Sequence, residues 1–344
     1  MHAVLFRRHG GPEALECADV PDPAPGPGEV LVRVKACALN HLDRWLREGI
    51  PAYRLTLPHI PGADVAGVIE RVGDGVTGLR AGDHVVLTPG LRCGQCAACC
   101  SNQDQGCPSY GIRGAACPGG YAELTIAKAA DALPIPGALS FETAAAFPLV
   151  FLTAWHMLIG RARLQAGETV LVQAAGSGVG HAAVQIAKHA RATVYATVGS
   201  DAKLPKVRAL GADAVINYQQ ERVDERINEL TGGRGVNVVV EHVGPQTWEG
   251  SVKVLAKGGR LVTCGATTGA SVLLDLRYVF SRQLTLLGSM MGTHQELLAV
   301  LELIKAHTLW PVIDTVFPLC DARQAHERLA SRDVFGKLLL LPNF

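Results

Sequence analysis

The chain has 344 residues, of which 48% are hydrophobic and 18% are charged, and its formal net charge is +1. This length predicts two domains with a large buried core. A charge so close to zero argues against nucleic acid or a membrane as the partner and leaves a small-molecule substrate. The first residues lack the apolar core of a secretory signal, so we expect a cytoplasmic protein in a reducing compartment.

The first part of the chain predicts a β-rich domain. Alternating or short apolar runs bounded by glycine or proline indicate strands at 3–6, 30–35, 61–73, 82–88 and 120–126. A short helix is expected at 42–47, closed by Gly49, and a longer helical segment at 141–159.

The second part of the chain alternates strands with helices. We expect strands at 169–172, 193–198, 214–216, 236–241, 260–264 and 284–287, and helices near 201–210, 221–230, 246–256, 294–306 and 321–331. Alternation of this kind implies a parallel sheet with right-handed crossovers. A last apolar strand at 336–341 is expected to return to the first domain.

One stretch, 168–188, has the layout of a dinucleotide-binding unit. An apolar strand is followed by a tight turn of small residues and then by a helix with apolar residues on one face. Small residues let backbone N–H groups approach a pyrophosphate, which also meets the positive end of the helix dipole. The predicted cofactor contacts in this turn are Gly176, Ser177, Gly178, Val179 and Gly180.

Cysteines are concentrated in residues 93–107, where Cys93, Cys96, Cys99 and Cys107 form a C-x2-C-x2-C-x7-C pattern. Four thiolates at this spacing favour one structural Zn²⁺ with no open position for water. An iron–sulfur cluster is the competing interpretation, and Cys100 has no place in the pattern. In a reducing compartment the ten cysteines are expected to be thiols or metal ligands and not a disulfide framework.

Together these motifs resemble the medium-chain dehydrogenase/reductase superfamily, which contains the zinc alcohol dehydrogenases and the quinone oxidoreductases. The resemblance covers almost the whole chain and rests on residues 28–34, 61–70, 82–85, 153–155, 209–213 and 336–338, besides the cysteine lobe and the central turn. It implies an α/β protein with a GroES-like catalytic domain and a doubly wound Rossmann domain. The boundaries it suggests are 1–148 with a zinc lobe at 90–110, then 149–287, then a C-terminal return at 288–344.

The chain departs from the zinc alcohol dehydrogenases at the catalytic metal. Where those relatives carry three metal ligands, this sequence has Asn40, Ala63 and Leu149 or a neighbour. An unusual metal site built from nearby donors remains the alternative, and the candidates are Cys37, His41, His59 and Asp64. Without a Lewis acid the hydroxyl of an alcohol is hard to ionise at neutral pH.

The segment from Asn40 to Asp43 instead resembles the zinc-free quinone and enone reductases. The resemblance implies hydride transfer from NAD(P)H to a quinone or to the activated C=C bond of an enone or an enoyl thioester such as enoyl-CoA. Asn40 and His41 are candidates to stabilise charge on the developing enolate oxygen. Tyr53, His41 or solvent could deliver the proton.

The end of the second Rossmann strand indicates which nicotinamide is used. Val198 stands where NAD enzymes of the family carry an acid, while Ser200, Lys203 and Tyr218 match residues near the 2′-phosphate of NADPH. These residues favour NADPH, although Asp201 keeps NADH open. Other positions that match the cofactor lining of relatives are Thr153, Val243, Gly244, Gly265, Ala266 and Lys337.

Two other functions remain compatible with the sequence. One is an alcohol dehydrogenase with non-standard metal ligands, and the other is a protein that binds the cofactor without catalysis. The resemblance also implies a homodimer or homotetramer, in which dimers join Rossmann sheets edge to edge.

Overall fold

The computed structural model describes residues 1–51 and 53–342 and divides the chain into two compact units. The first unit contains residues 1–149 and the C-terminal segment from Trp310, and the second unit is Val150–Leu309. The segment 288–309, which the sequence analysis assigns to the C-terminal return, lies in the second unit.

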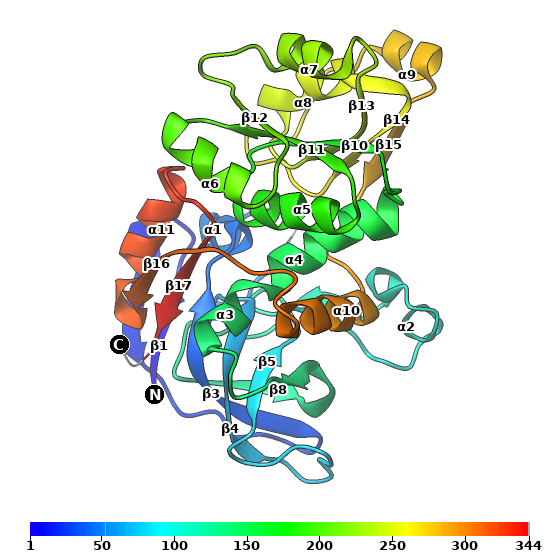
Figure 1. Ribbon diagram of the computed structural model, residues 1–344. Helices are drawn as coiled ribbons and strands as arrows, with labels where there is room; N and C mark the ends of the chain where they lie inside the picture. The colour runs from blue at the N-terminus through cyan, green and yellow to red at the C-terminus, as the bar shows by residue number, and fades with distance from the viewer. Residues whose placement is uncertain (52, 343–344) are drawn as a thin grey trace. The chain divides into compact units, whose positions relative to one another are not determined.

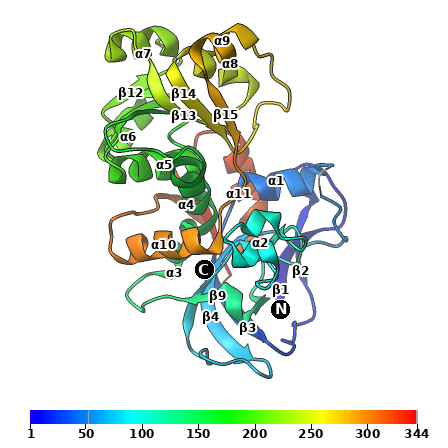
Figure 2. The ribbon, with the colours of Figure 1, turned by 90° about the vertical axis from the view of Figure 1, so that its right-hand side faces the viewer.

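The first unit is built on a seven-stranded sheet in the order β16-β17-β3-β4-β5-β9, with β8 also paired to β3. Strand β3 is its centre and pairs antiparallel with β4, β8 and β17. Figure 2 shows β3 and β4 together with the N-terminal strands β1 and β2. Because β17 pairs with β3, the last strand of the chain does return to the first domain.

The predicted strands of the first unit are present with shifted ends, and the structure adds strands at 15–19, 90–91, 111–112, 132–134 and 313–318 that the sequence analysis did not predict. Its strands are β1 (His2–Phe6), β2 (Leu15–Asp19), β3 (Glu29–Ala38), β4 (Asp64–Val72), β5 (His84–Leu87), β6 (Gly90–Leu91), β7 (Gly111–Ile112), β8 (Leu124–Lys128), β9 (Ala132–Pro134), β16 (Ile313–Pro318) and β17 (Lys337–Leu341). Its helices are η1 (Pro12–Ala14), α1 (His41–Glu48), α2 (Ala97–Cys100), η2 (Asp104–Gly106), η3 (Ala129–Asp131), α3 (Phe141–Ala146), η6 (Leu319–Asp321) and α11 (Ala322–Ala330).

One covalent link contradicts the sequence analysis. Cys17 on β2 and Cys320 on η6 form a disulfide across a sequence separation of 303 residues, with a Cα–Cα distance of 5.2 Å. The expectation that all ten cysteines are thiols or metal ligands is therefore wrong for this pair. Spacing along the chain could not reveal the pair, because only the return of the C-terminal segment brings η6 beside β2.

The second unit is a six-stranded, all-parallel sheet in the order β12-β11-β10-β13-β14-β15. The strands are β10 (Thr169–Val172), β11 (Thr193–Val198), β12 (Ala214–Asn217), β13 (Val236–Glu241), β14 (Leu255–Thr263) and β15 (Thr285–Gly288). The helices are η4 (His156–Arg161), α5 (Gly178–His189), η5 (Asp201–Lys203), α6 (Leu204–Ala209), α7 (Val223–Thr231), α8 (Pro245–Lys253), α9 (Leu276–Arg282) and α10 (His294–Lys305), and α4 (Pro148–Trp155) leads into the unit.

Helices cover both faces of this sheet, as a doubly wound fold requires. In Figure 1, α5 and α6 lie below the sheet and α7, α8 and α9 lie above it. The strand order runs outward from β10 in one direction and restarts at β13 in the other. In such sheets ligands bind outside the carboxyl ends of the strands where the order reverses, which here is between β10 and β13.

The predicted helix at 141–159 is divided into α3, α4 and a π-helical turn. The division falls at Pro148, which cannot donate a backbone hydrogen bond to the preceding turn and therefore begins a new helix. Within residues 1–51 and 53–342 no helix combines the length and the apolar character needed to cross a bilayer.

Strands β3 and β4 approach each other so closely that Gly67 has no room for a side chain. A Cβ at this position would lie 2.2 Å from the carbonyl oxygen of Arg33. We predict that Gly67→Ala lowers the free energy of unfolding by about 1–3 kcal/mol, because the two backbones must separate. Gly250→Ala in α8, where a Cβ meets nothing within 4 Å, is the control and is expected to be neutral or stabilising. Equal denaturation midpoints for the two variants would contradict this account.

Candidate functional site

The turn between β10 and α5 has the backbone geometry of an anion cradle. Ser177 caps α5, with its hydroxyl accepting a 2.9 Å hydrogen bond from the N–H of Gly180. Ala174 adopts φ +47°, and a Cβ on Gly180 would lie 2.4 Å from the carbonyl oxygen of Ala174. The turn therefore tolerates only a small residue at position 180, and the start of a twelve-residue helix faces the space beyond it.

This turn contains all five residues predicted from the central stretch. Gly176 and Ser177 form its tip, and Gly178, Val179 and Gly180 are the first residues of α5. The close backbone approach fits the pyrophosphate of a dinucleotide, which needs N–H donors and no intervening side chains.

The end of β11 carries the residues expected to distinguish the two nicotinamides. Val198 is buried at the strand end, and Ser200 precedes η5. Tyr218 lies against Gly199, because a Cβ on that glycine would be 2.4 Å from the Tyr218 hydroxyl. Asp201 has both carboxylate oxygens engaged, one by Asn217 at 2.7 Å and the other by Gln220 at 2.8 Å.

The predicted residues after β13 and β14 do come together. Gly244 adopts φ +96°, and a Cβ there would lie 3.3 Å from the Cα of Ala266. The hydroxyl of Thr268 donates to the carbonyl of Val243 at 2.8 Å, which ties the two strand ends to each other. Val243, Gly244 and Ala266 therefore form one surface with Gly265 at the carboxyl edge of the sheet. Thr153 is buried in α4.

In the first unit, Asn40, Asp64 and Lys337 form a buried polar cluster. The Lys337 ammonium donates to Asn40 Oδ1 at 2.6 Å and to Asp64 Oδ2 at 3.1 Å. Asn40 Nδ2 donates to the same Asp64 oxygen at 2.9 Å, and the N–H of Leu149 donates to Asp64 Oδ1 at 2.8 Å. The side chains of Asp64 and Lys337 are 0% and 2% exposed.

This cluster joins the three chain segments where the resemblance to zinc alcohol dehydrogenases places metal ligands. Asn40 is at the first of these expected positions, Asp64 follows Ala63 at the second, and Leu149 or a neighbour is at the third. Lys337, which is predicted to line the cofactor, bonds the first two segments. The role of Asp64 was missed by the sequence analysis, which treated it only as a spare donor. The signal for that role was an acidic residue at the start of a strand whose next five residues are apolar or glycine.

Asp43 supports Asn40 from within helix α1. Its carboxylate accepts from the N–H of Asn40 at 2.8 Å and of Gly62 at 3.1 Å, and from the Tyr121 hydroxyl at 3.3 Å. Burial raises the pKa of Asp43 to about 6, against the opposing effect of these backbone hydrogen bonds. The Asn-x-x-Asp segment thus acts locally as a capping box that fixes the orientation of Asn40.

The other two predicted catalytic residues are His41, at the start of α1, and Tyr53, which follows that helix. His41 is the first residue of α1, and its ring centroid is 6.2 Å from that of Trp45. Tyr53 is close enough to Tyr110 to contribute to the raised pKa of the latter, which is due mainly to burial. Burial also raises the pKa of the Tyr53 phenol.

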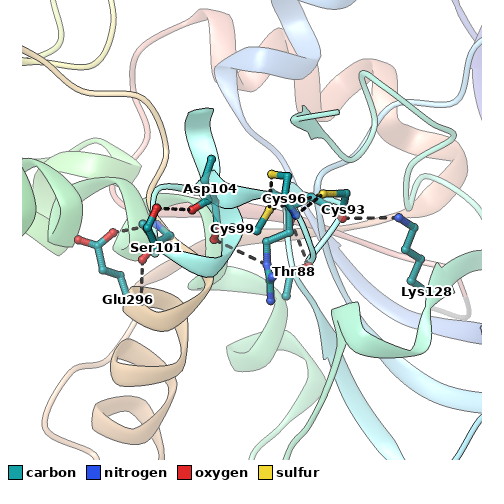
Figure 3. Close-up of polar contacts among 12 residues, drawn as sticks. Thr88, Cys93, Cys96, Cys99, Ser101, Asp104, Lys128 and Glu296 are labelled. Carbon is teal, nitrogen blue, oxygen red and sulfur yellow. Dashed lines mark hydrogen bonds and ion pairs between the residues drawn. The ribbon is translucent and has the colours of Figure 1, made fainter. Parts of the chain in front are cut away.

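The four patterned cysteines converge in the lobe around α2. Their sulfur atoms all lie within 4.8 Å of one another, and Figure 3 shows Cys93, Cys96 and Cys99 pointing toward a common centre. The Cys96–Cys99 and Cys93–Cys99 sulfur distances are 3.5 and 3.9 Å. Tetrahedral zinc with Zn–S bonds of about 2.3 Å requires sulfur distances of about 3.8 Å, so the set fits the ion.

Cys107 completes the set, and Cys100 is exposed and outside it, with its thiol directed to the carbonyl of Gln95 at 3.6 Å. Among residues 1–51 and 53–342, this is the one group of three or more His, Cys, Asp or Glu side chains spaced to hold a metal.

Comparison with known proteins agrees with this architecture. Residues 26–137 match the alcohol dehydrogenase GroES-like domain, and residues 178–306 match the zinc-binding dehydrogenase family. Quinone oxidoreductase from Rattus norvegicus is 32% identical, covering 99% of this chain and 98% of the relative. Quinone oxidoreductase 1 from Escherichia coli is also 32% identical, and the match covers 98% of this chain and 99% of the relative.

Solved structures give the same result from the fold. An NAD-dependent alcohol dehydrogenase has a TM-score of 0.95 and 47% identity, with 99% of both chains covered. A cobalt- and zinc-bound alcohol dehydrogenase from Pyrobaculum aerophilum has a TM-score of 0.91 and 37% identity, with 99% of both chains covered. E. coli quinone oxidoreductase in complex with NADPH has a TM-score of 0.84 and 32% identity, with 99% of this chain and 100% of that chain covered. The chain therefore belongs to the medium-chain dehydrogenase/reductase superfamily, and it is a nicotinamide-dependent oxidoreductase of that superfamily.

Proposed function

We propose that the protein uses NADPH to reduce a quinone or the activated C=C bond of an enone or enoyl thioester, without a catalytic metal. The observation that carries this proposal is the Asn40–Lys337–Asp64 cluster. The side chains of Asn40, Asp64 and Lys337 are bonded to one another, and the cation in the cluster is an ammonium. An ammonium supplies positive charge and N–H donors but no open coordination position.

The proposed reaction suits such a site because the acceptor carries its own electron sink. A bound reduced nicotinamide supplies hydride to the β carbon, and the negative charge collects on the carbonyl oxygen as an enolate. The fixed charge of Lys337 and the oriented amide of Asn40 favour that charge. A proton then reaches the α carbon from His41, Tyr53 or solvent.

The quinone oxidoreductase relatives support this choice, since proteins of that name match the chain over nearly its full length. An alcohol dehydrogenase with a non-standard metal site is the second candidate, favoured by the likeness to the cobalt- and zinc-bound enzyme of P. aerophilum. The two candidates differ in metal content and in the substrate reduced.

We also propose that NADPH is preferred over NADH. Val198 offers no acid to bind ribose hydroxyls, and the carboxylate of Asp201 is held by two amide side chains and is not directed to a ribose. Ser200 and Lys203 then provide a hydroxyl and a cation for the 2′-phosphate.

Metal analysis and turnover test the metal-independent reaction together. We expect about one zinc per chain, and we expect NADPH-dependent reduction of small enones or quinones to continue at an unchanged rate in a chelator such as EDTA. Cys99→Ser should lose the zinc, whereas Cys100→Ser, which alters the exposed neighbouring thiol, should keep it.

Two metal ions per chain, together with chelator-sensitive oxidation of simple alcohols, would favour the alcohol dehydrogenase instead. No turnover of any quinone, enone, enoyl thioester or simple alcohol, despite tight NADPH binding, would reject both reactions and leave a cofactor-binding protein.

Lys337→Met tests the ammonium itself. The variant keeps the apolar stem but leaves Asp64 as a buried carboxylate without its cation, so we expect a loss of about 3–5 kcal/mol in stability. At a temperature where it stays folded, kcat for enone reduction should fall by about 10-fold or more. Lys257→Met, at an exposed lysine of β14, is the control and should change neither quantity. Unchanged kcat in folded Lys337→Met would show that the ammonium does not assist the reaction.

Ser200→Asp combined with Lys203→Ala tests cofactor preference. The new carboxylate repels the 2′-phosphate, and removal of the lysine takes away its counter-charge, so the ratio of kcat/KM for NADPH to that for NADH should fall by about 100-fold. Lys206→Ala, an exposed lysine three residues further on, serves as control. A preference for NADH in the unaltered protein would contradict the proposal.

A further inference from the structure

A second buried charge lies in the Rossmann unit, at the carboxyl end of β13. Glu241 is the last residue of that strand and is 0% exposed. Its Oε1 accepts from the N–H groups of Val243 at 2.7 Å and Gly244 at 3.1 Å. Its Oε2 accepts from the hydroxyls of Thr247 at 2.8 Å and Ser251 at 2.6 Å.

These contacts continue into a hydrogen-bonded chain beneath both predicted cofactor turns. Gln173, directly after β10, donates to Ser251 Oγ at 3.0 Å and accepts from the Thr197 hydroxyl at 2.8 Å. That hydroxyl also accepts from the N–H of Ala174 at 3.0 Å, at the start of the glycine turn. The turn after β10 and the turn after β13 are therefore held by one buried network that ends on Glu241.

The position of this network is set by the strand order. Strands β10 and β13 are neighbours, and the order of the sheet reverses between them, so a dinucleotide crosses their carboxyl ends. The β11 side carries Ser200 and Lys203, which are predicted to meet the adenosine ribose. The β13 and β14 side, with Val243 and Gly244, is left for the nicotinamide half.

The carboxylate is not neutralised by its neighbours. No lysine or arginine in the described part of the chain forms an ion pair with Glu241, and its four partners are all donors, as a carboxylate requires. Burial lowers the pKa of His242, which keeps that ring neutral, and burial raises the pKa of the Cys264 thiol to about 12. The Glu241 carboxylate thus lies directly behind the Val243–Gly244 turn, held by N–H and O–H donors.

We propose that Glu241 tunes the nicotinamide, because its buried charge favours the oxidised ring, which is cationic, over the reduced ring, which is neutral. When the reduced ring gives its hydride to an acceptor it gains one positive charge, and the nearby carboxylate stabilises that product of the transfer. The protein would thereby be biased toward hydride donation. This inference rests on nicotinamide binding and not on the metal-independent reaction proposed above.

Glu241→Gln tests the charge while keeping the size of the side chain. Its amide oxygen can still accept from the two backbone N–H groups, and the Thr247 hydroxyl can rotate to accept. We expect the dissociation constant of the oxidised cofactor to rise on the order of 10-fold more than that of the reduced cofactor. Both constants are measured by titration without an acceptor, so the result does not depend on turnover or on the identity of the substrate.

Ser251→Ala is the matched control, since it removes a hydrogen bond to Glu241 but leaves the charge. It should raise the dissociation constants of the oxidised and the reduced cofactor by the same factor. If Glu241→Gln also weakens both forms equally, Glu241 only supports the turn and the proposal is overturned.

Should the thermal melt show that Glu241→Gln does not fold, Thr247→Lys provides the second variant. It keeps the carboxylate and places a cation against it, at a half-buried position in the first turn of α8. The binding of the oxidised cofactor should again be weakened more than that of the reduced cofactor. An unchanged ratio of the two dissociation constants would refute the proposal.

Discussion

The ion pair between Lys337 and Asp64 is the contact on which the first unit's functional arrangement depends. Its partners are 273 residues apart in the chain, and both side chains are almost fully buried. A buried charge pair is costly to desolvate and remains favourable only when its other hydrogen-bonding groups are satisfied. Here the amide of Asn40 and the backbone of Leu149 satisfy Asp64, so the last strand, the first helix and the start of β4 are held in one arrangement.

This pair is also the basis for proposing a reaction without a catalytic metal in a superfamily that contains zinc enzymes. Asn40 and Asp64, which lie at or beside the expected ligand positions, form hydrogen bonds with each other and with Lys337. The cysteine lobe, in contrast, retains four convergent sulfurs with the spacing of tetrahedral zinc. The four sulfurs come from one lobe, and the Asn40–Asp64–Lys337 cluster comes from other segments of the chain.

The Rossmann unit also contains a buried charged residue, Glu241, but this residue has no partner of opposite charge among the described residues. Glu241 is buried without a cation and is stabilised by N–H and O–H dipoles alone. Dipoles can hold a carboxylate in place without cancelling its field as a lysine would. One unit thus presents a paired cation near its polar cluster, and the other presents an unpaired anion behind a cofactor turn.

The sequence by itself predicted most of the elements and the glycine turn between β10 and α5. The periodicity predicted β11 and β13 with their observed ends. Small residues at 174–180 predicted the cradle, because turn geometry depends on local residue size. The spacing of the four cysteines predicted their convergence for the same reason, since all four lie within fifteen residues.

Only the tertiary structure decided which distant side chains meet. The Cys17–Cys320 disulfide, the Lys337–Asp64 pair and the network from Ala174 to Glu241 all join residues from separate elements. Lys337 illustrates the difference, because its motif did not indicate that pairing of β17 with β3 carries it to Asn40 and Asp64. Local patterns record which backbone conformation a segment prefers. The partner of a buried charge depends on strand order and on the return of the chain, which no local pattern contains.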